Sequence, residues 1–157
     1  MEAETEANHC MEKSRRKKSY SLVKAIFRAE GAIKAAVIEY KTARKKDIAG
    51  GGGKAFVSDP TAGQAMRELE ECPAVKLENW TVYRPQDWLR VIRLTYANTK
   101  MQERELMRRY FKGESIAELA SGNCGYEEPT LYVISRNFVA LGVEIACQFG
   151  LIRVIDT

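Results

Sequence analysis

The sequence has little of what catalytic and metal sites require. It contains one histidine, His9, and its cysteines form no Cys-x-x-Cys pair. A zinc site needs closely spaced soft ligands, and Ser/His/Asp or Cys/His nucleophile systems need a histidine, which only His9 could supply. We therefore expect no enzyme activity, no catalytic residue, no metal site and no cofactor. The four cysteines are interpreted as small apolar residues in a reducing cytoplasm: Cys10, Cys72, Cys124 and Cys147.

Long apolar runs are also lacking. The uninterrupted apolar stretches are far shorter than the roughly 20 residues of a membrane span, and Glu2, Glu4 and Glu6 make the start too acidic for a signal peptide. We expect a soluble cytoplasmic protein without a membrane partner. A chain of 157 residues allows one compact domain of roughly 100 residues plus an appendage.

The positive charge is concentrated near the start of the chain. Twenty-five Lys and Arg against twenty-one Asp and Glu give +4 overall, and residues 1–48 carry twelve basic and seven acidic side chains. Residues 1–18 end in the polar block Ser14–Lys18, which offers too little apolar surface to offset the entropy lost on ordering. They are predicted to be a basic disordered tail, which either contacts phosphate or keeps the chain soluble.

Residues 19–48 are predicted to form one long amphipathic helix. Val23, Phe27 and Val37 widen the apolar face, which must be buried against either the C-terminal part of the chain or a second copy. We favour a homodimer, because a glycine run separates this helix from the rest. The stripe of predicted dimerisation residues follows alternating spacings of four and three: Leu22, Ile26, Ala29, Ile33, Ala36 and Tyr40.

Gly50–Gly53 has no side chains to pack, so residues 49–57 are predicted to be a flexible linker at a domain boundary. A phosphate-binding loop would need Gly-Lys-Ser/Thr, whereas Lys54 is followed by Ala55.

Residues 58–157 are predicted to be a helical domain, so the fold class is all-α with one short β-hairpin. Ser58–Thr61 begins a helix that runs to about Glu71. Ala74–Leu77 with Trp80–Tyr83 is typical of a short β-hairpin or an extended arm. Further helices are predicted over 84–98, 102–112, 114–120 and about 127–149, and Gly113 closes the second of these in the left-handed conformation. The apolar side of the 84–98 helix comprises Trp88, Leu89, Val91, Ile92 and Tyr96.

The last two helices, about 114–149, have the order of a helix-turn-helix, whose second helix presents side chains to the DNA major groove. Ile116, Ala117 and Leu119 give the first helix a compact apolar face. The inward stripe of the second comprises Leu131, Ile134, Phe138, Leu141 and Ile145. Its predicted outward, DNA-binding face comprises Thr130, Tyr132, Val133, Ser135, Arg136 and Asn137.

These side chains suit base and phosphate contacts. Arg136 could bond guanine or phosphate, Asn137 adenine, and Thr130 a phosphate or a thymine methyl group. The helix also starts with two acids, Glu127 and Glu128, which repel phosphate. Dimerisation and the cations of the preceding helix would therefore supply much of the affinity; these cations are Arg104, Arg108, Arg109 and Lys112. A helical bundle that merely resembles a DNA reader is the alternative.

From Ser58 onward the chain resembles phage late-gene transcriptional activators of the RinA and ArpU type, whose C-terminal domain is similar to region four of sigma factors. The matching segments are Ser58–Ala62, Arg84–Ile92 followed by Thr95-Tyr96, Glu105–Gly113, and the region around Thr130-Leu131-Tyr132. The resemblance implies an all-helical domain that binds promoter DNA and engages host RNA polymerase, without catalysis. The chain departs from the family between Ser121 and Glu128, where the turn is longer and acidic.

Three functions remain open at this stage. The first is a sequence-specific transcriptional regulator that binds double-stranded DNA. The second is the small DNA-recognition subunit of a phage packaging terminase, which also combines a helical reader with an oligomerising helix. The third is a protein-interaction module that does not bind DNA.

Overall fold

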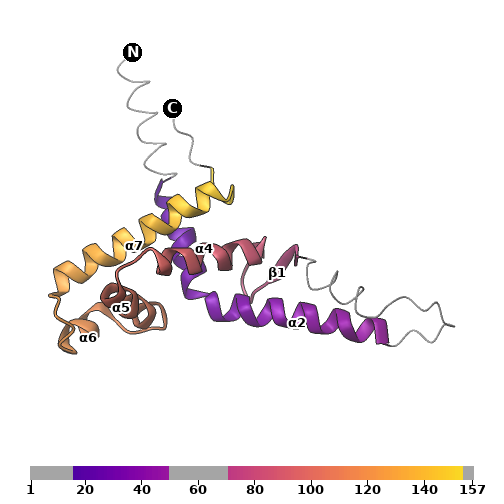
Figure 1. The fold of residues 1–157 in the computed structure, drawn as a ribbon, viewed down its shortest axis with the longest axis horizontal. Coiled ribbons are helices and arrows are strands. Elements are labelled where there is room, and N and C mark those ends of the chain that lie inside the picture. The colour runs from indigo at the N-terminus through magenta and orange to yellow at the C-terminus, as the bar shows by residue number, and fades with distance from the viewer. Residues whose placement is uncertain (1–15, 50–70, 154–157) are drawn as a thin grey trace, which may run out of the picture. The chain divides into compact units, whose positions relative to one another are not determined.

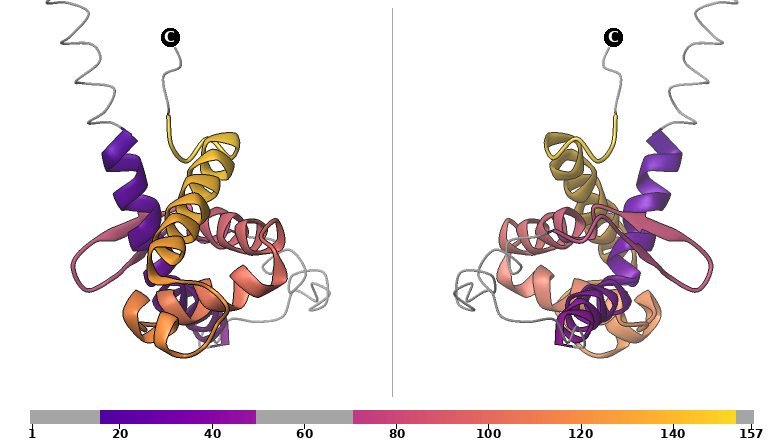
Figure 2. Two further views of the ribbon diagram at one scale, coloured as in Figure 1. Left: turned by 90° about the vertical axis from the view of Figure 1, so that its left-hand side faces the viewer. Right: turned by 90° about the vertical axis from the view of Figure 1, so that its right-hand side faces the viewer.

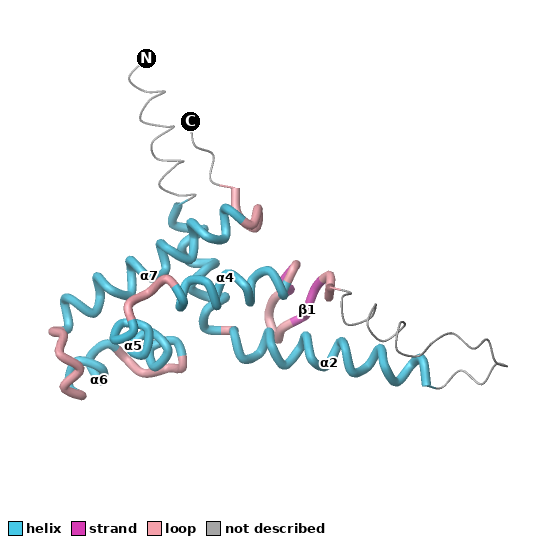
Figure 3. Tube along the Cα trace, viewed as in Figure 1, coloured by secondary structure: helices cyan, strands magenta, loops and turns pink. Residues whose placement is uncertain are grey.

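The computed structural model describes residues 16–49 and 71–153, with side chains over 16–43 and 71–153. This part of the chain is mostly helical and has a single two-stranded antiparallel sheet, which confirms the all-α prediction with one hairpin (Figures 1 and 3). The elements are a first helix over 16–28, α2 (Glu30–Ala49), β1 (Ala74–Lys76), β2 (Thr81–Tyr83), α4 (Pro85–Ala97), α5 (Met101–Phe111), α6 (Ile116–Ser121) and α7 (Glu128–Gln148).

The chain divides into two compact units. Among the described residues, unit 1 contains 16–29 and 90–153, and unit 2 contains 30–49 and 71–89. The predicted tail up to residue 15, the glycine linker from residue 50 and the predicted 58–71 helix up to residue 70 lie outside the described residues.

The helix predicted as continuous over 19–48 is broken at Ala29. The amide of Ala29 is shared between the carbonyl oxygens of Ala25 at 3.0 Å and Ile26 at 3.1 Å, and a new helix, α2, begins at Glu30. Gly31 follows directly, and glycine is a poor helix former because it loses the most backbone freedom. The helix also extends further back than predicted, since residues 16–18 are helical.

Four aromatic rings form the centre of unit 1. Phe27 lies 6.0 Å from Tyr96, 5.3 Å from Phe111 and 5.1 Å from Phe138, measured between ring centroids. Tyr96 and Phe138 are 4.9 Å apart, and three of the described pairs are tilted. The first helix is therefore joined to α4, α5 and α7 by one aromatic cluster, and such pairs add stability beyond their buried area.

The first helix crosses α7 at Gly142, and both views of Figure 2 show the two helices side by side. A Cβ atom at Gly142 would lie 2.9 Å from Cε2 of Phe27 and 3.0 Å from Cγ1 of Val23. Both distances are shorter than carbon–carbon contact allows. The helix pair can approach this closely only because residue 142 has no side chain.

The buried residues of the first helix and α2 agree only partly with the predicted stripe, of which Ile26 and Ile33 are buried. Val23, Ile26 and Phe27 are buried in unit 1, whereas Leu22 is 39% exposed. In unit 2, Ile33 and Val37 are buried. Val23, Phe27 and Val37 are the residues predicted to widen the apolar face, whereas Ala29, Ala36 and Tyr40 of the stripe are only half-buried. Of the two alternatives for this helix, packing within the chain is observed for residues 23–27, and dimerisation stays a prediction.

Unit 2 contains the predicted hairpin. Val75 faces Val82, and the amide of Leu77 donates to the carbonyl of Trp80 at 2.8 Å, which closes the turn. Gln86 Oε1 accepts from the amide of Cys72 at 3.0 Å and so connects the start of α4 to the residue before the hairpin. Each strand is one residue shorter than predicted.

The later helices lie where the sequence places them. α4, α5, α6 and α7 begin and end within two residues of the predicted bounds. On α4, Trp88, Val91, Ile92 and Tyr96 are buried as predicted, and Leu89 is half-buried. Gly113 has a φ of +119°, so it closes α5 with a positive φ as predicted.

α7 is also long and apolar enough to cross a membrane by length and composition, the one such helix among the described residues. The core helix of a folded domain meets the same criteria. In unit 1, α7 contributes to the core: its residues Leu131, Phe138 and Val139 are at most 3% exposed.

Candidate nucleic-acid interface

The three helices α5, α6 and α7 pack on one another in unit 1. α6 has only six residues, too few to be stable alone. A capping box fixes its start: Ser115 Oγ accepts from the amide of Glu118 at 3.2 Å, and the amide of Ser115 donates to Glu118 Oε2 at 2.7 Å. The backbone hydrogen bond from Ser115, followed by the side-chain bond, lowers the pKa of the Glu118 carboxyl.

The inner face of α6 is narrower than predicted. Ile116 and Leu119, three residues apart on one helix face, are buried, whereas Ala117 is exposed. Ala117 lies about 100° round the helix from Ile116, so the prediction that it belongs to the apolar face of α6 is wrong.

The inner face of α7 is wider than predicted. Leu131, Ile134, Phe138 and Ile145 are buried as predicted, and Leu141 is half-buried. Three further buried residues, Val139, Gly142 and Ala146, extend this face.

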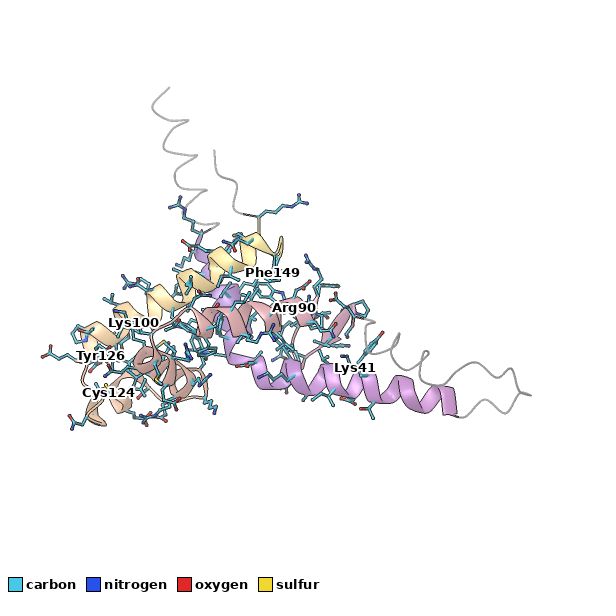
Figure 4. The ribbon with its side chains drawn as sticks, viewed as in Figure 1. Lys41, Arg90, Lys100, Cys124, Tyr126 and Phe149 are labelled. Atoms are coloured by element: carbon cyan, nitrogen blue, oxygen red, sulfur yellow. The ribbon has the colours of Figure 1, made fainter. Side chains whose placement is uncertain are left out.

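The loop between α6 and α7 comprises residues 122–127 and is longer than an ordinary helix-turn-helix turn. Asn123 and Gly125 have positive φ values of 57° and 82°. Gln102 Nε2, on α5, donates to the carbonyl oxygen of Cys124 at 3.2 Å. The loop, on which Cys124 and Tyr126 are labelled in Figure 4, is thus attached to α5.

The outer face of α7 begins near its N-terminal end and carries five of the six predicted DNA-binding residues: Thr130, Tyr132, Val133, Arg136 and Asn137. Thr130, Val133 and Asn137 follow spacings of three and four along one row, and Tyr132 and Arg136 form a neighbouring row. The side chains of Arg136 and Asn137 have no hydrogen-bond or ion-pair partner among the described residues. Their polar groups are therefore presented to solvent on a helix whose opposite face is buried in the core.

The sixth predicted residue, Ser135, does not belong to this face. It is 7% exposed, and its hydroxyl donates to the carbonyl of Tyr132 at 3.2 Å. Ser135 is four residues after Leu131 and three before Phe138, so the helix turns it toward the core. The prediction that it lies on the outward face is wrong.

Two of the four predicted cations on α5, Arg104 and Arg109, are held by hydrogen bonds within the protein. Arg104 Nη2 donates to the carbonyl oxygens of Ala97 at 3.3 Å and Thr99 at 3.1 Å, which secures the end of α4. Arg109 forms a two-point pair with Glu114, with Nε–Oε1 at 2.9 Å and Nη2–Oε2 at 2.7 Å, and this pairing raises the pKa of Arg109. These guanidinium groups stabilise the fold rather than extend toward a ligand.

The other two cations are more accessible. Arg108 lies 5.2 Å from the ring centroid of Tyr96 and 3.7 Å from Glu105 Oε2, with 49% of its side chain exposed. Lys112 is exposed at the C-terminal end of α5 and has no ion-pair partner among the residues that the structure describes.

Sequence reasoning missed two further cations. Lys24 and Arg28, on the first helix, both lie over the ring of Tyr110. The signal was present in the sequence, because residues 16–29 contain five basic residues and no acidic one. Phosphate contact is one sequence-based alternative for residues 1–18, but it was not considered for Lys24 or Arg28.

Within the described ranges, no three His, Cys, Asp or Glu residues come close enough together to hold a metal ion. Comparison of the chain with protein-family models, with curated proteins and with solved structures found no match.

Proposed function

We propose that the protein is a sequence-specific DNA-binding transcriptional regulator, and that it acts as a phage or prophage late-gene activator that binds promoter DNA and engages host RNA polymerase. The observation that carries the proposal is the exposed outer face of α7. The opposite side of this helix is packed against α5, α6 and the first helix. The resemblance to RinA and ArpU activators supports the biological setting.

On the outer face of α7, the side chains suited to base contacts lie on the second and third turns of the helix rather than on the first. Glu127 and Glu128 are exposed at the start of the helix and repel phosphate there. Arg136 and Asn137 lie two turns further on and carry the donors and acceptors that pair with guanine and adenine edges. Arg108 and Lys112 on α5 are the accessible cations for phosphate contacts.

The first test is recovery and sequencing of fragments that the purified full chain retains from sheared DNA of its source genome, at near-physiological salt. Enrichment upstream of a structural-gene operon is the expected result. Enrichment beside terminase genes would favour the packaging subunit instead, and no enrichment would contradict DNA reading.

The second test assigns the reading helix. Arg136→Ala should weaken binding to the best enriched site by about 5-fold to 150-fold, because a guanine contact is worth ~1–3 kcal/mol. Gln148→Ala, an exposed change at the far end of the same helix, is the matched control and should leave binding unchanged. If Arg108→Ala abolished binding while Arg136→Ala had no effect, α7 would not be the reading helix.

A protein-interaction module without DNA binding is the second candidate, and one observation favours it. The outer face of α7 combines two exposed apolar side chains, Tyr132 at 52% and Val133 at 50%, with exposed Glu127 and Glu128 at its start. Mixed apolar and acidic surfaces suit a protein partner better than DNA. Failure to bind any duplex at low salt, where phosphate attraction is strongest, would favour this candidate.

A further inference from the structure

The first helix carries a concentration of positive charge that is not part of the outer face of α7. Residues 16–28 contain five basic residues and no acidic one: Arg16, Lys17, Lys18, Lys24 and Arg28. Lys17, Lys24 and Arg28 are separated by seven and four residues, which places them along one face of a helix.

Two of these cations converge on one aromatic ring of α5. Lys24 Nζ lies 5.7 Å, and the guanidinium carbon of Arg28 5.9 Å, from the ring centroid of Tyr110. Contact with a ring face attracts and positions a cation but does not neutralise its charge. Lys24 and Arg28 have no carboxylate partner among the described residues.

The carboxylate of Glu114, which follows α5 in the chain, is already paired. Glu114, four residues after Tyr110, accepts both hydrogen bonds of Arg109 at 2.9 and 2.7 Å. That pair contributes no net charge, so the positive charge of Lys24 and Arg28 is not offset there.

The basic face is directed away from the core of unit 1. The buried side of the first helix is Val23, Ile26 and Phe27, and Phe27 lies in the aromatic cluster. Lys17 and Arg28 are exposed, and Lys24 is half-buried against Tyr110. A polyanion can therefore contact this face without displacing any core residue.

We infer that the first helix and Tyr110 form a phosphate-contacting surface for the backbone of double-stranded DNA, separate from the outer face of α7. The choice of DNA as the polyanion rests on the proposed function. The cations positioned over Tyr110 would contact phosphates at any sequence, and α7 would supply the preference for one site.

The salt dependence of DNA affinity tests this inference. The full chain is titrated with its best enriched duplex and with an unrelated duplex of equal length, at several salt concentrations. Affinity falls as salt rises, and a plot of log affinity against log salt has a negative slope. In the double variant Lys24→Gln/Arg28→Gln this slope should become shallower by about 0.9 for each lost phosphate contact, equally on both duplexes. The matched control is Lys34→Gln/Lys41→Gln on α2, which removes the same charge and should change the slope by less than half as much.

The outcomes separate this inference from the proposed function. A wild-type slope retained by the double variant, with the thermal midpoint unchanged, would overturn the phosphate-contacting surface and leave the proposed function standing. A reduced slope together with unaltered site preference in Arg136→Ala would support the surface while overturning reading by α7. Absence of duplex binding at low salt, or tighter binding to vesicles of anionic phospholipid than to duplex, would overturn the assignment to DNA.

Discussion

At the scale of single residues, Gly142 and Gly31 are both helical glycines, but they occupy different surroundings. A side chain at Gly142 would meet Phe27 and Val23 at 2.9–3.0 Å, whereas nothing lies within 4 Å of the position of a Cβ at Gly31. Gly142→Ala should lower the free energy of unfolding by about 1–3 kcal/mol, because the first helix must move away from α7. Urea denaturation measures this change.

Gly31→Ala is the matched control for that substitution. It adds the same methyl group to open space at the start of α2, and should raise stability by roughly 0.5–1 kcal/mol by restricting the unfolded chain. If Gly142→Ala were as stable as Gly31→Ala, the close crossing of the first helix and α7 would be wrong.

Glu118 should make stability depend on pH in acid. Its pKa is lowered from 4.5 by hydrogen bonds from Ser115, so the folded state binds this proton less readily than the unfolded state does. The stabilisation is complete above pH 4.5 and is lost as the pH falls through the lowered pKa. Thermal midpoints of the wild type and Glu118→Gln should therefore differ at pH 7 and converge in stronger acid. A constant difference across this range would contradict the capping box.

Individual polar residues were the hardest to assign from sequence. Arg104 and Arg109 look like the remaining cations of a DNA-binding helix, but their partners are backbone carbonyls of α4 and the carboxylate of Glu114. Spacing along one helix cannot show which backbone groups of another segment need a donor. Ser135 could have been placed correctly from the sequence. It lies four residues after Leu131 and three before Phe138, and this spacing puts it on the inner face of the helix.

At the scale of elements, local signals were sufficient for helix ends and for the hairpin. Gly113 ends α5, Ser115 begins α6, and the turn at Glu78-Asn79 joins the strands, each through interactions within a few residues. The break at Ala29 was not predicted, because the apolar spacing continues through it. Helix continuity there depends on which neighbours each half contacts, and the sequence does not show this.

The burial of residues on the first helix determines which substitution can test dimerisation. Ile26 is 1% exposed within its own chain, so Ile26→Asp should unfold unit 1 rather than produce monomers. Leu22 is 39% exposed, and Leu22→Asp is therefore the substitution that tests pairing between copies. Circular dichroism should show a large loss of stability for Ile26→Asp and little for Leu22→Asp. Equal losses would contradict the assigned buried face.

At the scale of the whole molecule, the sequence places a boundary at the glycine run, whereas residues 16–29 group with 90–153 and not with the α2 that follows them. Long-range aromatic contacts, such as Phe27 with Phe138, determine this grouping. Native mass spectrometry of the full chain distinguishes a transcriptional regulator from a packaging subunit by the number of copies in the assembly. A dimer is expected for a regulator, and a ring of roughly eight or more copies would favour a packaging subunit.

Unit 1 is assembled from segments that are far apart in the chain, and this has a consequence for its synthesis. Phe27 is translated more than a hundred residues before Phe138 and Gly142, against which it packs. At about 5–20 residues per second, the apolar side of the first helix waits several seconds or more for its partner. During that interval the nascent chain exposes Val23, Ile26 and Phe27 to chaperones, and unit 1 closes only after α7 has left the ribosome.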